Sequence, residues 1–98
     1  MSTERLRLDT DTFHLHFGPQ SIRLTKREFE ILKRLLNCDG GYVERQDLLR
    51  LVWGPHISVE VRTVDSHVAR LRKKLLQIGG SDGPTIETVW GLGYRVRY

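Results

Sequence analysis

The chain has 98 residues, of which 39% are hydrophobic and 29% are charged, and its formal net charge is +4. This length suits one domain with a modest core, and this composition excludes a disordered tail. Cys38 is the single cysteine, which excludes an internal disulfide and favours a reducing compartment. No apolar run resembles a signal peptide, and none approaches the length of a membrane span.

Residues 1–24 predict a small antiparallel sheet of short strands. Hydrophobic and charged or polar side chains alternate over 6–8 and again over 13–17, which is typical of strands with one buried face. A turn at Gly18-Pro19 then leads to a third short strand around Ile22.

The next segment, 25–78, predicts three helices. The first begins at Thr25, because Thr25 followed by Glu28 is a capping-box pattern. An apolar stripe at helical spacing follows these two residues, and Gly40-Gly41 is expected to end the helix.

The second and third helices are expected on either side of a short loop. The second covers Arg45–Val52 and is stopped by Gly54-Pro55. The third begins near Ser58 or Glu60 and runs to about Ile78, so that 60–78 is its approximate extent.

A helical wheel of residues 61–78, drawn at 100° per residue, separates an apolar face from a cationic face. An apolar arc of about 100° can be buried, and it carries Val61, Val64, Val68, Leu71, Leu75 and Ile78. The opposite face carries Arg62, Ser66, Arg70, Lys73 and Gln77, with Thr63 and Lys74 beside them. Cations interspersed with small hydroxyl side chains suit an approach to base edges in the DNA major groove. The absence of Glu from this face makes a merely solvated helix a poorer interpretation than groove binding.

The chain ends with a predicted hairpin over 85–98. Strands at Thr85–Val89 and Tyr94–Tyr98 flank a turn at 90–93, and Arg95 and Arg97 lie on its exposed face. A two-stranded wing beside a recognition helix reaches phosphates or the minor groove.

Four segments together resemble the winged-helix effector domain of OmpR/PhoB-type response regulators. They are LTKREFEIL (24–32), ERQDLLRLVWG (44–54), VEVRTVDSHVARLRKKL (59–75) and TVWGLGYRV (88–96). The resemblance implies an α+β fold, a winged helix-turn-helix in which a four-stranded N-terminal sheet and a C-terminal hairpin flank three helices. It also implies one domain over 1–98, whose third helix reads double-stranded DNA.

The resemblance assigns roles to individual positions. Thr63, Ser66 and Arg70 are expected nearest the bases. Phosphate contacts are expected from Arg45, Trp53, Arg62, His67, Arg72 and Lys73. The wing is represented by Thr88, Trp90, Tyr94 and Arg95. The loop of Gly54, Pro55, His56, Ile57 and Ser58 is where activators of this family meet RNA polymerase.

The family also implies partners beyond this domain. Two copies are expected to bind direct repeats head to tail, as a homodimer on DNA, in the cytoplasm of a bacterium and on its nucleoid. A receiver domain of about 120 residues, a size typical of one domain, usually precedes this unit and is absent from this chain. The sequence is compatible with an excised domain and with a stand-alone protein.

Three positions depart from the family pattern. Trp90 occupies the wing tip, where many relatives carry an arginine that reads the minor groove, and Ala69 replaces a phosphate-binding arginine of some relatives. Weaker wing-derived specificity follows, because an indole has one donor and no charge. Glu44 stands where Ser or Thr usually precedes the second helix, and it caps a helix less well.

Other functions are less well supported. His14 and His16 share a strand face, but no further ligand spacing completes a metal site, so neither a metal nor another cofactor is expected. Asp65, Ser66 and His67 are adjacent on one helix and point in different directions, so a catalytic triad and an enzyme are not expected. A winged helix used as a protein-interaction module, or as an RNA binder, remains the alternative.

Overall fold

Within the residues that the structure describes, short strands, three helices and a final hairpin follow one another, as the sequence predicts. The computed structural model describes residues 6–38, 41–56 and 58–97. Its elements are β1 (Leu6–Asp9), β2 (His14–Phe17), β3 (Gln20–Arg23), α2 (Lys26–Leu36), β4 (Val43–Glu44), α3 (Arg45–Trp53), α4 (Arg62–Gly79), β5 (Thr85–Val89) and β6 (Gly93–Arg97). None of these helices is long and apolar enough to cross a membrane.

The N-terminal sheet has the order β1-β2-β3, and both strand pairs are antiparallel. Leu8 pairs with Leu15, and Leu15 pairs with Ile22, so one apolar row crosses the three strands. Leu15 is fully buried. The described residues form three strands here rather than the four that the family resemblance implies, and 1–5 lie outside them.

The capping box predicted for α2 is confirmed. The backbone N–H of Glu28 donates to Thr25 Oγ1 at 3.2 Å, and the backbone N–H of Thr25 donates to Glu28 Oε1 at 2.9 Å. The predicted end at Gly40-Gly41 is wrong, because the helix stops at Leu36 with Asn37 as its C-cap. Residues 39–40 themselves lie outside the described part.

A second sheet joins the middle of the chain to its end. Its order is β4-β6-β5, and the two-residue strand β4 was not predicted from the sequence. β4 pairs with β6 through Val43 opposite Tyr94 and Glu44 opposite Gly93. A Cβ atom on Gly93 would lie 2.1 Å from the carbonyl oxygen of Val43, so this approach of the two strands requires glycine.

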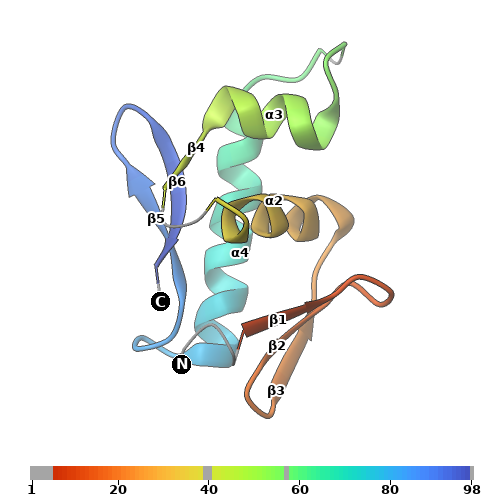
Figure 1. Ribbon diagram of the computed structural model, residues 1–98, viewed down its shortest axis with the longest axis vertical. Coiled ribbons are helices and arrows are strands. Elements are labelled where there is room, and N and C mark those ends of the chain that lie inside the picture. Colours follow the sequence, from red (N-terminus) through yellow and green to blue (C-terminus); the bar gives the residue numbers. More distant parts are fainter. Residues whose placement is uncertain (1–5, 39–40, 57, 98) are drawn as a thin grey trace.

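The long helix α4 is the centre of the fold, and it contacts α2, α3, β3 and β5. Figure 1 shows α4 behind α2. The hairpin lies along one side of α4, and the N-terminal sheet lies near the C-terminal end of α4. The helix begins at Arg62, later than predicted, because Val61 and the residues before it form a tighter turn. The N–H of Thr63 bonds to the carbonyl of Glu60 at 2.9 Å, an i to i−3 contact.

Candidate nucleic-acid interface

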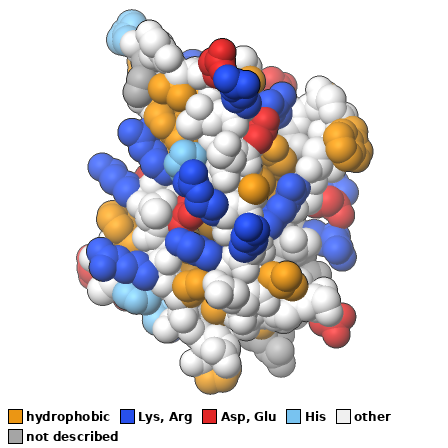
Figure 2. All heavy atoms as spheres, turned by 180° about the vertical axis from the view of Figure 1, so that it is seen from behind, with side chains coloured by type: hydrophobic (Ala, Val, Ile, Leu, Met, Phe, Trp, Pro, Cys, Tyr) orange, Lys and Arg blue, Asp and Glu red, His pale blue; other side chains and the backbone are white. Residues whose placement is uncertain are grey.

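The two faces predicted for α4 are present. Of the predicted apolar set, five residues are buried and Val61 is half-buried; the buried ones are Val64, Val68, Leu71, Leu75 and Ile78. The opposite residues are all exposed, and they are Arg62, Ser66, Arg70, Lys73 and Gln77. Figure 2, seen from the side opposite to Figure 1, shows Lys and Arg side chains gathered across the middle of this face. The cationic side of the helix is therefore open to a large partner.

The exposed cations of α4 have few protein partners. Arg62 Nε lies 2.7 Å from Glu60 Oε1, and both side chains are exposed, so this ion pair is weak. Within the described residues, Arg70 and Lys73 have neither an ion pair nor a hydrogen bond from their side chains. These two cations are free to meet an anion from outside the domain.

Hydroxyl groups lie beside these cations. Ser66 is exposed, and its Oγ lies 3.4 Å from the carbonyl oxygen of Arg62, a long contact that leaves the hydroxyl available. Thr63 is half-buried one turn earlier. The three residues predicted nearest the bases, Thr63, Ser66 and Arg70, therefore lie on successive turns of the N-terminal half of α4.

His67 and Trp53 form a cluster to which Arg27 also belongs. The rings of Trp53 and His67 meet edge to face with centroids 5.0 Å apart, and the Arg27 guanidinium lies 4.9 Å from the centroid of the same indole. Arg27 also donates to the carbonyl of Val52 at 3.1 Å. Side-chain contacts in this cluster thus connect α2, α3 and α4. Arg27 belongs to the cluster, although the sequence analysis did not identify it.

The tautomer of His67 follows from its neighbours. Its Nδ1 lies 2.8 Å from the backbone carbonyl oxygen of Thr63. Because a carbonyl oxygen only accepts, Nδ1 carries the proton. The second ring nitrogen, Nε2, remains for a partner outside the helix.

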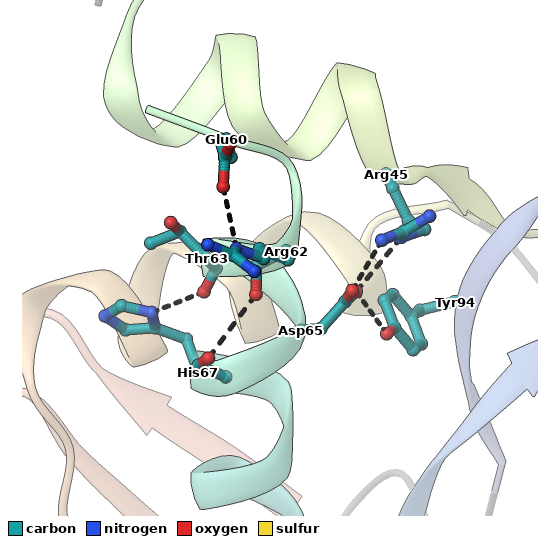
Figure 3. A network of polar contacts seen from close by, with 8 residues as sticks. Arg45, Glu60, Arg62, Thr63, Asp65, His67 and Tyr94 are labelled. Carbon is teal, nitrogen blue, oxygen red and sulfur yellow. Dashed lines mark hydrogen bonds and ion pairs between the residues drawn. The ribbon is translucent and has the colours of Figure 1, made fainter. Parts of the chain in front are cut away.

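Asp65 is the one acid in the basic segment, and it joins three elements (Figure 3). Arg45 of α3 donates to both carboxylate oxygens, at 3.0 Å from Nε and 2.5 Å from Nη2, and the Tyr94 hydroxyl of β6 donates at 2.6 Å. Burial raises the pKa of Asp65, but the bonds from Arg45 and Tyr94 outweigh it and hold this pKa below its usual value. Burial and the bond to Asp65 raise the pKa of Tyr94 to about 12.

Arg72 fixes the wing to α4. Its Nε donates to the carbonyl of Ile86 and its Nη2 to Thr88 Oγ1, both at 2.8 Å, and its guanidinium lies 5.5 Å from the centroid of the Tyr94 ring. The residue is half-buried. A phosphate contact by Arg72 stays a prediction, and the bonds seen here give it a structural role that the sequence did not indicate.

Lys74 is also engaged inside the protein. Its Nζ donates to Glu28 Oε1 at 2.6 Å, and Glu28 is fully buried. Burial raises the pKa of Glu28, but the bonds from Lys74 and Thr25 lower it by more than burial raises it. The pKa of Glu28 therefore lies below its usual value. Lys74 therefore neutralises a buried carboxylate that caps α2.

The predicted wing and loop residues lie at two separate edges of the domain. Arg45, Asp65, Thr88, Trp90 and Tyr94 line one hollow between the hairpin and the start of α3. In the loop before α4, Gly54 is the C-cap of α3, and the loop's other described residues, Pro55, His56 and Ser58, are exposed. Ile57 lies outside the described residues.

Two alternative sites gain no support from the geometry. The rings of His14 and His16 are stacked 6.1 Å apart, and the described residues hold no group of three metal-ligating side chains. Asp65 bonds to Arg45 and Tyr94 while His67 bonds to the backbone of Thr63, so these neighbours do not line up for proton relay.

Comparison with known proteins agrees with this arrangement. The family model "Transcriptional regulatory protein, C terminal" matches residues 19–96. The transcriptional regulatory protein SrrA of Staphylococcus aureus is 36% identical over 92 residues, which cover 94% of this chain and 38% of SrrA. The chain thus spans well under half the length of the curated relatives it matches.

Two solved DNA-binding domains are similar to this chain over at least 92% of their own length. The DNA-binding domain of Bacillus subtilis CssR superposes with a TM-score of 0.78 at 31% identity, covering 94% of this chain and 99% of that one. The AdeR DNA-binding domain, solved in complex with an intercistronic region, gives a TM-score of 0.77 at 30% identity, covering 94% and 92%. Thermotoga maritima DrrB, an OmpR/PhoB homologue, gives 0.76 at 33% identity, covering 96% and 42%. The chain belongs to the family of transcriptional regulatory protein C-terminal domains, the winged-helix effector domains of OmpR/PhoB-type response regulators.

Proposed function

We propose that this domain binds double-stranded DNA as the sequence-reading part of a transcriptional regulator. The exposed face of α4 enters the major groove, and the hairpin lies next to the adjacent minor groove. Relatives described as DNA-binding domains, one of them solved on an intercistronic region, support the proposal.

One observation carries it: α4 buries its apolar side and leaves Arg62, Arg70 and Lys73 exposed on the other. An α-helix fits the width of the major groove, and arginine can bond guanine O6 and N7 there. Ser66, next to these cations, is short enough to let the helix approach the base edges.

Base-proximal and phosphate-contacting residues divide by position. We assign Thr63, Ser66 and Arg70 to the bases. The phosphate set comprises Arg45, Trp53, Arg62, His67, Arg72 and Lys73. Arg72 would contribute through Nη1, because its Nε and Nη2 already donate to the wing. The members of this set on α3 and α4 flank the base-proximal residues, so they would fix the register of the helix without reading sequence.

The experiment is a binding titration on duplex DNA at several salt concentrations. A duplex selected from a random pool supplies the site, and fluorescence anisotropy gives the binding constant. If several phosphates are neutralised, log K falls against log salt by about 0.9 per contact. A shallow slope would favour a protein-interaction module, and preference for single strands would favour RNA recognition.

The finer assignments rest on family likeness and on the size of the domain. A single module makes a small interface, so useful affinity requires two copies on half-sites about one helical turn apart. We propose a head-to-tail homodimer on direct repeats, cytoplasmic and nucleoid-associated when bound. The loop around Pro55 and His56 is exposed, as a contact with RNA polymerase requires.

The role we propose is binding rather than catalysis. Two titratable side chains of α4 that are not exposed are engaged in structural contacts: Asp65 is bound to Arg45 and Tyr94, and His67 is bound to the carbonyl of Thr63. A cofactor has no place in this mechanism.

A further inference from the structure

The tip of the hairpin is apolar and open to solvent. Trp90 is 88% exposed and Leu92 is 48% exposed. Gly91, between them, has a φ of +76°, and the N–H of Leu92 closes the turn onto the carbonyl of Val89 at 2.9 Å. A tight turn therefore presents two large apolar side chains at the end of the wing.

The charged side chains of the wing are paired with one another. Glu87 Oε1 accepts from Arg95 at 2.7 Å, and Glu87 Oε2 lies 3.0 Å from Arg97 Nε. These three are the charged residues of the hairpin among its described residues, 85–97. The wing thus carries one net positive charge, on two arginines that share Glu87 as their partner, and its tip at 90–92 carries none.

The position of the tip relative to α4 is fixed. Arg72 bonds to β5 at Ile86 and Thr88, and Tyr94 of β6 bonds to Asp65 of α4. Binding therefore needs little reorganisation of the wing, which favours contacts made at the tip.

A hollow separates the tip from the helices. It is lined on one side by Arg45 and Gln46 and on the other by Trp90 and Leu92. One sugar–phosphate strand separates the major groove from the next minor groove, so a strand that follows this hollow would have α4 on one side and the tip on the other. Arg45 would lie beside its phosphates.

We propose that Trp90 and Leu92 enter the minor groove next to the half-site as an uncharged wedge. They contact sugars and the edge of a base step through apolar surface, as apolar wedges do in other minor-groove binders. The inference rests on the proposed function and specifies how its wing reads the flank. The contact adds affinity without releasing counterions, and it favours easily deformed pyrimidine–purine steps over stiff, narrow A-tracts.

The test compares two proteins on two duplexes. Wild type and Trp90→Ala are titrated with a single half-site that includes the flanking minor groove, and with the same half-site cut before the flank. On the flanked duplex Trp90→Ala weakens binding at least about fivefold at every salt concentration, with an unchanged salt slope. On the cut duplex the two proteins bind alike.

Two further variants sharpen the comparison. Leu92→Ala weakens binding to the flanked duplex, whereas Leu51→Ala, a leucine of α3 that is also 48% exposed, leaves it unchanged. Trp90→Arg makes the salt slope steeper by about 0.9, because it adds a phosphate or groove cation, and it increases binding to A·T-flanked sites. Unfolding temperatures check that each variant remains folded.

Equal binding of wild type and Trp90→Ala to the flanked duplex overturns the inference while leaving the proposed function intact. A loss seen only with two adjacent half-sites also overturns it, because the tip would then contact a second copy of the domain. Failure of the wild type to bind any duplex would instead contradict the proposed function itself.

Discussion

Two groups of cations on α4 have different surroundings. Arg70 and Lys73 lie on its exposed face and have no protein partner within the described residues. Arg72 and Lys74, close to them in sequence, bond to Ile86, Thr88 and the buried Glu28. The first group is available to DNA, and the second holds the wing and α2 against the helix.

The difference shows that the charge of a segment overstates the charge it offers to a partner. Cations at adjacent positions are about 100° apart around a helix, so Lys73 and Lys74 point to different surroundings. Lys74 reaches Glu28 on α2, and Lys73 reaches solvent. Substitutions at neighbouring pairs can separate the two roles.

The largest effect is expected on stability from Lys74→Met. Removing this ammonium leaves the fully buried carboxylate of Glu28 without its cation, which costs about 3–5 kcal/mol in the free energy of unfolding. Lys73→Met is the matched control and changes that free energy by less than about 0.5 kcal/mol. Urea unfolding measures both variants. Equal stability of the two variants would contradict the distinction between exposed and internally bonded cations on α4. The double variant Glu28→Gln with Lys74→Met should recover much of the lost stability.

A second pair separates binding from folding. Arg70→Ala raises the free energy of DNA binding by roughly 1–3 kcal/mol and relaxes specificity at one base pair, without loss of stability. Arg72→Ala lowers the free energy of unfolding by about 2 kcal/mol, because the Ile86 carbonyl and the Thr88 hydroxyl lose their donor. It also weakens binding to all sequences alike. Anisotropy titrations against single-base variants of the site, with unfolding curves, measure these effects. A loss of affinity in Arg72→Ala that depends on one base pair would contradict the assignment of base contact to Arg70 rather than to Arg72.

Tyr94→Phe tests the contact between the wing and Asp65. At neutral pH the loss of its hydrogen bond to a carboxylate costs about 1.5 kcal/mol. The pKa of Tyr94 is raised from 10.0 to about 12 in the folded domain, so its stabilisation is complete below about pH 10 and is lost as pH rises through about 12. The wild-type advantage over Tyr94→Phe should therefore shrink across this range. Parallel stability curves for the two proteins from pH 9 to pH 12 would show that the phenol does not contribute in this way.

The smallest effect is expected at the exposed end of α4. Glu60→Gln removes the partner of Arg62, but both side chains are largely exposed, at 71% and 82%, so stability changes by less than about 0.5 kcal/mol. Binding to DNA tightens slightly at low salt, because an acid is removed from the cationic face. Weaker binding would mean that Glu60 positions Arg62 rather than competing for it.

The parts of this structure that depend on burial periodicity were predictable from the sequence. The buried and exposed sides of α4, the capping box of Thr25 and Glu28, and the hairpin all follow from local patterns that the core or the backbone enforces. β4 was not predictable, because two residues show no alternation and Val43–Glu44 is a strand only through its pairing with β6.

The sequence predicted the exposed residues of the candidate site. It was less informative about residues whose side chains bond to other elements of the fold. Whether Arg72 or Arg45 faces solvent depends on which acceptors β5 and α4 bring near it, and no local pattern contains that information. One signal could have been used: Asp65 is a lone acid among cations, and such a residue suggests a structural partner. Arg27 offered no comparable signal, since its contact with Trp53 arises from the packing of α2 against α3.

The most direct test of the central claim is a side-chain NMR titration. Arginine Nε–Hε resonances of the isotopically labelled domain are followed as a duplex containing the selected site is added. The account predicts large shifts for Arg62 and Arg70 and a small shift for Arg72, whose Nε already donates to Ile86. Unchanged Arg62 and Arg70 resonances, with shifts confined to the arginines of the N-terminal sheet, Arg7 and Arg23, would contradict a major-groove role for α4.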